Sequence, residues 1–176
     1  MSKPETSVPS PVRVLLQPGE YFVGDERHEI RTVLGSCVSI TLWHRARHIG
    51  AMSHFLLASR GKHLDASDRD GRYGEEALSL MLEGLRSRNV AMHECEGKLF
   101  GGGNMFPLIS GCHALQSVGQ KNGDAARQLL ADLSIPLVSE SLYGTGHREI
   151  VFNVATGDVW VRQVPPAEVK EESLFA

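Results

Sequence analysis

Only two segments of this chain repeat apolar residues with the period of an amphipathic helix, and this scarcity most constrains the fold. Both sets follow the i, i+3, i+4, i+7 spacing of a helix face. They are Leu78, Met81, Leu82 and Leu85 within residues 75–88, and Ala126, Leu129, Leu130 and Leu133 within residues 124–133. Asp124 is the expected N-cap of the second helix, and Pro136 lies just beyond its end.

Short apolar runs with Gly or polar breaks predict β-strands over most of the remaining chain. The runs are 12–16, 30–34, 38–43 and 49–53, followed by 148–154 and 158–164, which flank Ala155-Thr156-Gly157 as a hairpin. So few helices among so many strands disfavour a doubly wound parallel fold. We therefore predict an α/β fold of the α+β type, with mixed, mostly antiparallel sheet layers and two main helices packed on them.

The length of 176 residues fits one domain. We place that domain at 12–164, between a Pro- and Ser-rich N-terminal tail at 1–11 and a C-terminal tail at 165–176 that begins with Pro-Pro. The net charge of −3 lacks the basic excess typical of nucleic-acid binders, so we expect no nucleic-acid partner.

The three cysteines, Cys37, Cys95 and Cys112, form no Cys-x-x-Cys pair. An odd number of free thiols favours a reducing compartment, and we expect a cytoplasmic protein. The longest charge-free stretch, residues 99–120, is rich in glycine and also holds a proline, so we expect no membrane insertion.

Cys37 is the strongest candidate for chemistry. It follows Gly35-Ser36 at the start of an apolar run, where a tight turn brings main-chain N–H groups near the sulfur, as an oxyanion hole requires. His54 ends the next apolar run, so the two residues meet if the runs are neighbouring strands. A buried structural cysteine is the competing interpretation, because free cysteine is among the most buried residue types.

Two further patterns could indicate a phosphate loop and a zinc site, but each has a simpler interpretation. Gly101-Gly102-Gly103 lacks the Gly-Lys-Ser/Thr that a phosphate loop needs, so we expect Gly102 and Gly103 to form backbone beside the site, with Asn104 lining its pocket. The irregular spacing of His93, Cys95, Cys112 and His113 argues against a zinc site. We expect neither a metal nor a cofactor.

Several blocks, taken in order, resemble the CheD family, the chemoreceptor glutamine deamidases. They are LGSCV at 34–38, GAMSHFLL at 50–57, Arg72-Tyr73, KLFGGGNMF at 98–106 and VGQKN at 118–122. Together the blocks span roughly 20–164. Ordered blocks of this kind are far more specific than any one motif, and the domain at 12–164 is thus similar to a CheD-like cysteine hydrolase.

The resemblance implies a protein-glutamine glutaminase of bacterial chemotaxis, which converts glutamine side chains of methyl-accepting receptors to glutamate through a cysteine thioester. Its Thr, Cys, His site falls on Thr32, Cys37 and His54, with Gly35 and Ser36 beside the oxyanion. Thr32 is expected to orient the imidazole, with Thr41 as the alternative. We also expect a His54 imidazolium to hold the pKa of the Cys37 thiol below about 8.5.

Two other functions stay open at this point. One is a methylesterase acting on receptor glutamyl esters, since one thiol can attack an ester or an amide. The other is a non-catalytic binding module that regulates a CheC-type phosphatase, which would also be a second partner besides the receptors. The Cys37 and His54 pair favours the enzyme, because a pure binding module has no physical need for it.

Overall fold

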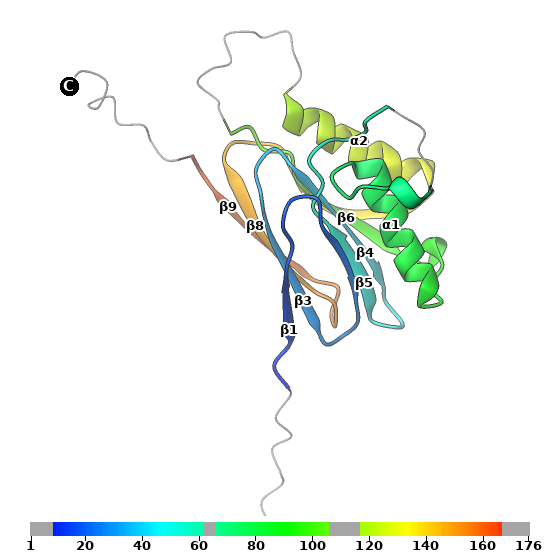
Figure 1. Ribbon diagram of the computed structural model, residues 1–176. Coiled ribbons are helices and arrows are strands. Elements are labelled where there is room, and N and C mark those ends of the chain that lie inside the picture. Colours follow the sequence, from blue (N-terminus) through cyan, green and yellow to red (C-terminus); the bar gives the residue numbers. More distant parts are fainter. Residues whose placement is uncertain (1–8, 62–65, 106–116, 167–176) are drawn as a thin grey trace, which may run out of the picture.

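Three layers make up the structure: two β-sheets face each other, and two helices cover the second sheet (Figure 1). This computed structural model describes residues 9–61, 66–105 and 117–166. The outer sheet has the order β1 (Val12–Leu15), β3 (His28–Leu34), β8 (His147–Asn153) and β9 (Val159–Val164). The central sheet has the order β2 (Tyr21–Gly24), β5 (Ile49–Ser53), β4 (Val38–His44), β6 (Glu96–Gly101) and β7 (Leu137–Leu142).

The helices are α1 (Gly74–Ser87) and α2 (Val118–Asp132), and short 3₁₀ turns occupy Ala66–Asp68 and Met92–Glu94. Only the pairs β1–β3 and β6–β7 are parallel within the described residues. The predicted α+β fold, mostly antiparallel with two main helices, is thus confirmed.

β4 is buried along its whole length because both of its faces are covered. Its residues Val38, Ile40 and Leu42 pack in one core with α1 and α2. Cys37 and Trp43 pack on the opposite face, in a second core between the two sheets. The face toward the outer sheet also carries the buried polar residues Ser39 and Thr41.

The second helix differs from its prediction. It begins at Val118, and the Ser117 hydroxyl accepts the Gln120 N–H at 3.2 Å as the N-cap, so Asp124 is not the cap. Its first turns contain glycines that pack too closely for a side chain. A Cβ on Gly119 would lie 2.5 Å from the Gly102 carbonyl oxygen, and one on Gly123 would lie 2.6 Å from the Tyr143 ring. Close packing here outweighs the low helix propensity of glycine.

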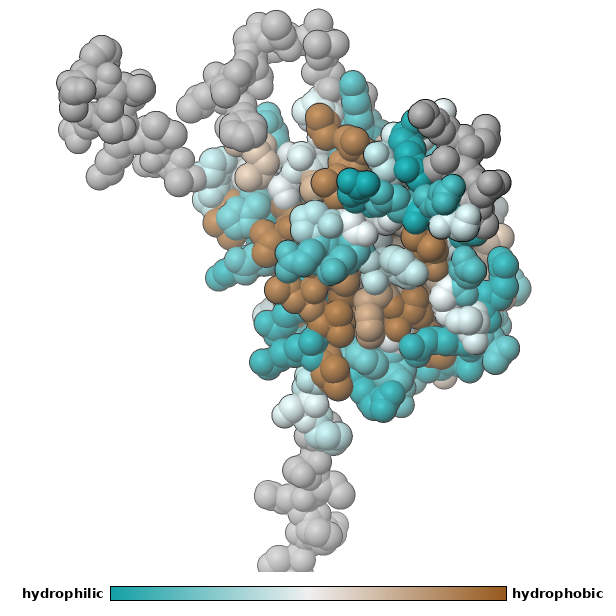
Figure 2. Space-filling view, viewed as in Figure 1, coloured by the Kyte–Doolittle hydropathy of each residue, from teal (hydrophilic) through white to brown (hydrophobic). Residues whose placement is uncertain are grey.

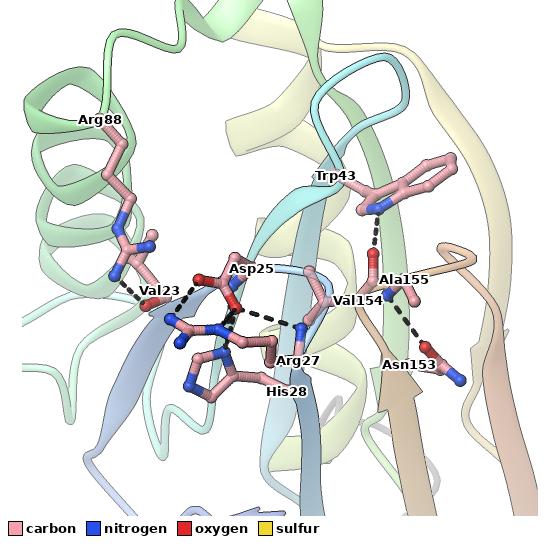
Figure 3. A network of polar contacts seen from close by, with 9 residues as sticks. All are labelled: Val23, Asp25, Arg27, His28, Trp43, Arg88, Asn153, Val154 and Ala155. Atoms are coloured by element: carbon pink, nitrogen blue, oxygen red, sulfur yellow. Dashed lines mark hydrogen bonds and ion pairs between the residues drawn. The ribbon is translucent and has the colours of Figure 1, made fainter. Parts of the chain in front are cut away.

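The two sheets are joined at the end of β4 remote from Cys37. The Trp43 indole N–H donates to the Val154 carbonyl oxygen at 2.8 Å, next to the turn in which Asn153 accepts from Ala155 N–H (Figure 3). At the same end Asp25 holds Arg27 in the turn that leads into β3. The Trp43 bond connects the sheets at this end, and the site lies at the other end.

Apolar side chains reach the surface along the edge strand β1, where Val12 and Leu15 are 54% and 61% exposed (Figure 2). No helix among the described residues combines the length and the apolar character needed to cross a membrane. Most of both predicted tails, like Cys112 and His113, lies outside the described residues.

Candidate active site

The strand register places Cys37 and His54 on one face of the central sheet. Ile40 to Val38 in β4 run antiparallel to β5 and its extension, and Val38 pairs with Phe55 through main-chain bonds of 3.1 and 3.0 Å. The same register puts Ser39 opposite His54, with Cys37 one diagonal step away on the same face. Diagonal neighbours are within reach of an imidazole. Both side chains face the outer sheet.

Thr32 approaches His54 from the outer sheet. Its hydroxyl donates to the Leu16 carbonyl oxygen at 2.8 Å and lies 2.7 Å from His54 Nδ1. A hydroxyl has one proton. Because Thr32 donates that proton to the Leu16 carbonyl oxygen, the Thr32 oxygen accepts a hydrogen bond from His54 Nδ1–H. The proton on Nδ1 leaves Nε2 as the basic nitrogen. The hydroxyl bonded to Nδ1 is that of Thr32, not that of Thr41.

The turn between β1 and β2 encloses His54. The His54 N–H donates to the Glu20 carbonyl oxygen at 2.9 Å, and Gly19 N–H donates to the His54 carbonyl oxygen at 2.7 Å. The imidazole is buried, and its Nε2 has no hydrogen-bond partner among the described residues. A buried basic nitrogen without a partner is costly in a purely structural site, and the register places this imidazole on the same sheet face as Cys37.

The directions in which the pKa values of Cys37 and His54 shift contradict the expected thiolate. Burial raises the pKa of the Cys37 thiol, against a smaller lowering by its own main-chain N–H. Burial also lowers the pKa of His54, and the Leu16 carbonyl and Glu20 charge oppose that shift only in part. Both groups are therefore neutral at rest. The expected low thiol pKa is wrong because burial disfavours both charges and no thiol–imidazole hydrogen bond forms in the described structure.

The glycine-rich segment holds the Cys37 turn from its carbonyl side. Gly102 N–H donates to the Cys37 carbonyl oxygen and Gly103 N–H to that of Gly35, both at 2.8 Å. A Cβ on Gly101 would lie 2.2 Å from the Cys37 carbonyl oxygen, so that approach requires glycine. Because the Gly102 and Gly103 N–H groups are already engaged, they support the turn rather than face a substrate.

A cavity lies beside this segment. Its described lining is Gly102, Asn104, Ser117, Gln120, Tyr143 and Gly144. Gly102 and Asn104 belong to this described lining, which includes no charged side chain and none of Cys37, His54 or Thr32.

Two buried polar residues near the site escaped the sequence analysis. Arg148, from β8, donates to the carbonyl oxygens of Gly101 and Tyr143 and to the Ser141 hydroxyl, and so joins the sheets beneath the glycine segment. Asn122, from α2, donates to the carbonyl oxygens of Ser36 and Leu56. Asn122 shares the four-residue spacing of Ala126 and Leu130, a signal that becomes visible once the helix begins at Val118.

Cys95 has a different setting from Cys37. It is buried in the core on the helix side, its thiol lies 3.7 Å from the Ala91 carbonyl oxygen, and burial raises its pKa to about 11. Such a thiol is a weak nucleophile at neutral pH. Among the described residues no group of three His, Cys, Asp or Glu side chains is arranged to hold a metal ion.

The model of the family described as CheD chemotactic sensory transduction matches residues 56–163. The chain belongs to the CheD family. One CheD relative, from Albidiferax ferrireducens, is named a probable chemoreceptor glutamine deamidase and is 57% identical over 156 residues, which cover 89% of this chain and 90% of the relative.

More distant CheD proteins carry the same name. One from Chromobacterium violaceum is 40% identical over 93% of this chain and 83% of its own length. One from Pseudomonas savastanoi pv. phaseolicola is 37% identical over 91% of this chain and 89% of its own length. The match to CheD thus extends over both sheets and both helices.

Proposed function

We propose that this CheD-family chain is a chemoreceptor glutamine deamidase whose nucleophile is Cys37 and whose base is His54. The observation that carries the assignment is the His54 imidazole: Thr32 fixes its Nδ1 proton, and its Nε2 is unpartnered on the face that also holds Cys37. The names of the relatives supply the reaction and the receptor substrate. The cytoplasmic location expected from the cysteine content is part of this proposal.

In the proposed reaction, His54 Nε2 takes the Cys37 proton as the sulfur bonds to the carboxamide carbon of a receptor glutamine. The imidazolium then returns that proton to the departing nitrogen, the C–N bond breaks, and ammonia leaves a thioester. Water attacks the thioester carbon with His54 again as base. The C–S bond breaks, and the products are glutamate and the free thiol.

The oxyanion of each tetrahedral intermediate needs N–H donors. In a trans peptide the carbonyl and the N–H that follows it point in opposite directions. The Gly35 carbonyl is held by Gly103 and the Ser36 carbonyl by Asn122, so the N–H groups of Ser36 and Cys37 point away from those anchors. In the described structure neither N–H donates to a main-chain carbonyl. We assign both to the oxyanion.

Replacing Thr32 by Val, which keeps the shape but removes the hydroxyl, should lower kcat by about 10²-fold with KM nearly unchanged. Loss of the bond to Nδ1 misplaces the base without altering the surface that binds the receptor. Thr32→Ser keeps the hydroxyl and should recover most of the turnover. Ammonia release from a receptor fragment measures both variants. An unchanged kcat in Thr32→Val would return the orienting role to Thr41 or to a main-chain carbonyl.

A folded receptor fragment should be deamidated with kcat/KM at least about 10³-fold above that of free glutamine. Cys37 lies beside glycine-rich backbone, which suits the close approach of a protein surface, so we expect binding energy to come from the rest of a protein substrate. Mass spectrometry of a receptor fragment, its unfolded peptides, free glutamine and a glutamyl methyl ester makes the comparison. Equal efficiency on free glutamine would indicate a small-molecule amidase, and cleavage of the ester alone a methylesterase.

The non-catalytic alternative loses support from the geometry, because a binding module needs neither the Thr32–His54 bond nor an unpartnered Nε2. Binding to a CheC-type phosphatase does not conflict with deamidation and stays a prediction from the family resemblance. The receptors are the partners that the proposed reaction itself requires.

A further inference from the structure

Asn122 is a polar residue in an apolar stripe. Its side chain is 1% exposed and lies on the face of α2 that also buries Ala126 and Leu130. A buried amide is retained without cost only where its donors find acceptors. Here one nitrogen, Nδ2, donates to two carbonyl oxygens, that of Ser36 at 3.1 Å and that of Leu56 at 2.7 Å.

The two carbonyls come from different strands of the site. Ser36 precedes Cys37 in the turn between β3 and β4, and Leu56 follows His54 by two residues beyond β5. The amide of Asn122 thus connects the segment of the nucleophile to the segment of the base. This side-chain contact adds to the main-chain bridge between Val38 and Phe55, which also joins the two segments.

The Ser36 carbonyl shares its peptide plane with the Cys37 N–H. Because the plane is rigid, an anchor on the carbonyl also fixes the direction of that N–H, which points away from α2. The same N–H interacts with the Cys37 sulfur and lowers the pKa of the thiol slightly. An N–H beside the attacking sulfur is suitably placed to meet the oxyanion that forms on the attacked carbon.

We propose that Asn122 is a positioning residue for deamidation: its amide fixes the Ser36–Cys37 peptide plane so that the Cys37 N–H faces the oxyanion. Asn122 lies behind the turn and acts through that peptide without touching substrate. The inference rests on the proposed function, in which Cys37 is the nucleophile. It assigns a task to the VGQKN block at 118–122 that the catalytic residues leave unexplained.

The test compares an oxyanion-forming reaction with one that forms none. Asn122→Ala should lower kcat for deamidation of a receptor fragment by about 10²-fold, with KM within about threefold of the parent. Alkylation of Cys37 by iodoacetamide displaces iodide without forming an oxyanion, so its rate should stay within about threefold. Iodoacetamide labelling is followed by mass spectrometry, and Asn122→Ser serves if the alanine variant does not fold.

Asn122→Asp provides a rescue that packing alone cannot give. Its carboxylate has no donor, but a protonated carboxyl has one O–H. The ratio of kcat in Asn122→Asp to kcat in Asn122→Ala should therefore rise as pH falls from 8 to 6. Asn153→Ala is the matched control, because Asn153 bonds locally to Ala155 at the far end of β8 and should leave kcat unchanged.

The possible results distinguish a failure of the Asn122 proposal from a failure of the proposed deamidase function. Parental kcat in Asn122→Ala, or an equal fall in kcat and in the alkylation rate, overturns the positioning role, since an equal fall marks a displaced thiol. A flat Asp-to-Ala ratio also overturns it. Deamidation that survives Cys37→Ala would instead remove the nucleophile assignment, and with it the basis of this inference.

Discussion

Cys37→Ala and Cys37→Ser should both lose deamidation by about 10⁴-fold or more while keeping the fold. The loss is this large because no other described thiol is close to His54, and removal of a nucleophile also removes the use of its base. The side chain lies at the edge of the core between the sheets and is only partly buried, so its replacement should cost stability no more than about 1 kcal/mol.

Ammonia release from a receptor fragment and far-UV circular dichroism measure activity and fold for the Cys37 variants. Cys95→Ala is the matched control, because Cys95 packs on the helix side of the central sheet and should retain the parental rate. Activity within tenfold of the parent in Cys37→Ala would move the nucleophile elsewhere. A base would then have to take a proton from a water molecule that attacks the carboxamide carbon directly, and the described site offers only His54 for that role.

The sequence predicted those parts of the fold in which side-chain period reflects burial. β4 and β5 are buried on both faces, so their apolar runs were visible, and the stripe of Leu78 and Leu85 marked α1. β2, β6 and β7 escaped. β2 and β7 are short or exposed edge strands, and β6, although mostly buried, contains Gly97, Lys98 and Gly101 and so shows no apolar run. β7 lies largely in solvent and pairs in parallel with β6 through main-chain bonds, which leave little pattern in the side chains.

At the site, the sequence predicted that the ends of two strands would bring Cys37 and His54 to one place. The register in the structure puts both residues on one face, although their catalytic roles stay a prediction. What local sequence could not show are the contacts from distant segments. The Leu16 carbonyl, which fixes the Thr32 hydroxyl, follows the end of β1. Asn122, which lies behind the turn, belongs to α2. Both contact the site only after folding.

The prediction that the pKa of the Cys37 thiol is lowered was wrong for a related reason. A Cys and a His near each other suggest an ion pair, in which each charge stabilises the other. The structure buries His54 under the β1–β2 turn and partly buries Cys37 between the sheets, where a neutral pair is cheaper than two desolvated charges. Burial is a property of the assembled layers, and no motif of a few residues contains it.

The pH dependence of deamidation tests this neutral pair. Catalysis needs His54 unprotonated, so kcat/KM should fall as pH falls through the pKa of His54. Burial lowers that pKa from its ordinary 6.5, and the acidic limb should therefore have its midpoint below 6.5. At the other end, burial raises the pKa of the Cys37 thiol from its ordinary value, so Cys37 alkylation by iodoacetamide should still increase with pH through the neutral and mildly alkaline range.

His54→Ala should lower kcat by about 10²–10⁴-fold and remove the acidic limb, because no side chain then takes the thiol proton. The remaining activity should rise steadily with pH as hydroxide ionises Cys37. His48→Ala, at the exposed turn after β4, is the matched control and should keep the parental profile. An alkylation rate that is already constant between pH 6 and 8 would show a preformed thiolate. The base would then act mainly on the leaving ammonia, and Thr32 would hold an imidazolium in place of a neutral ring.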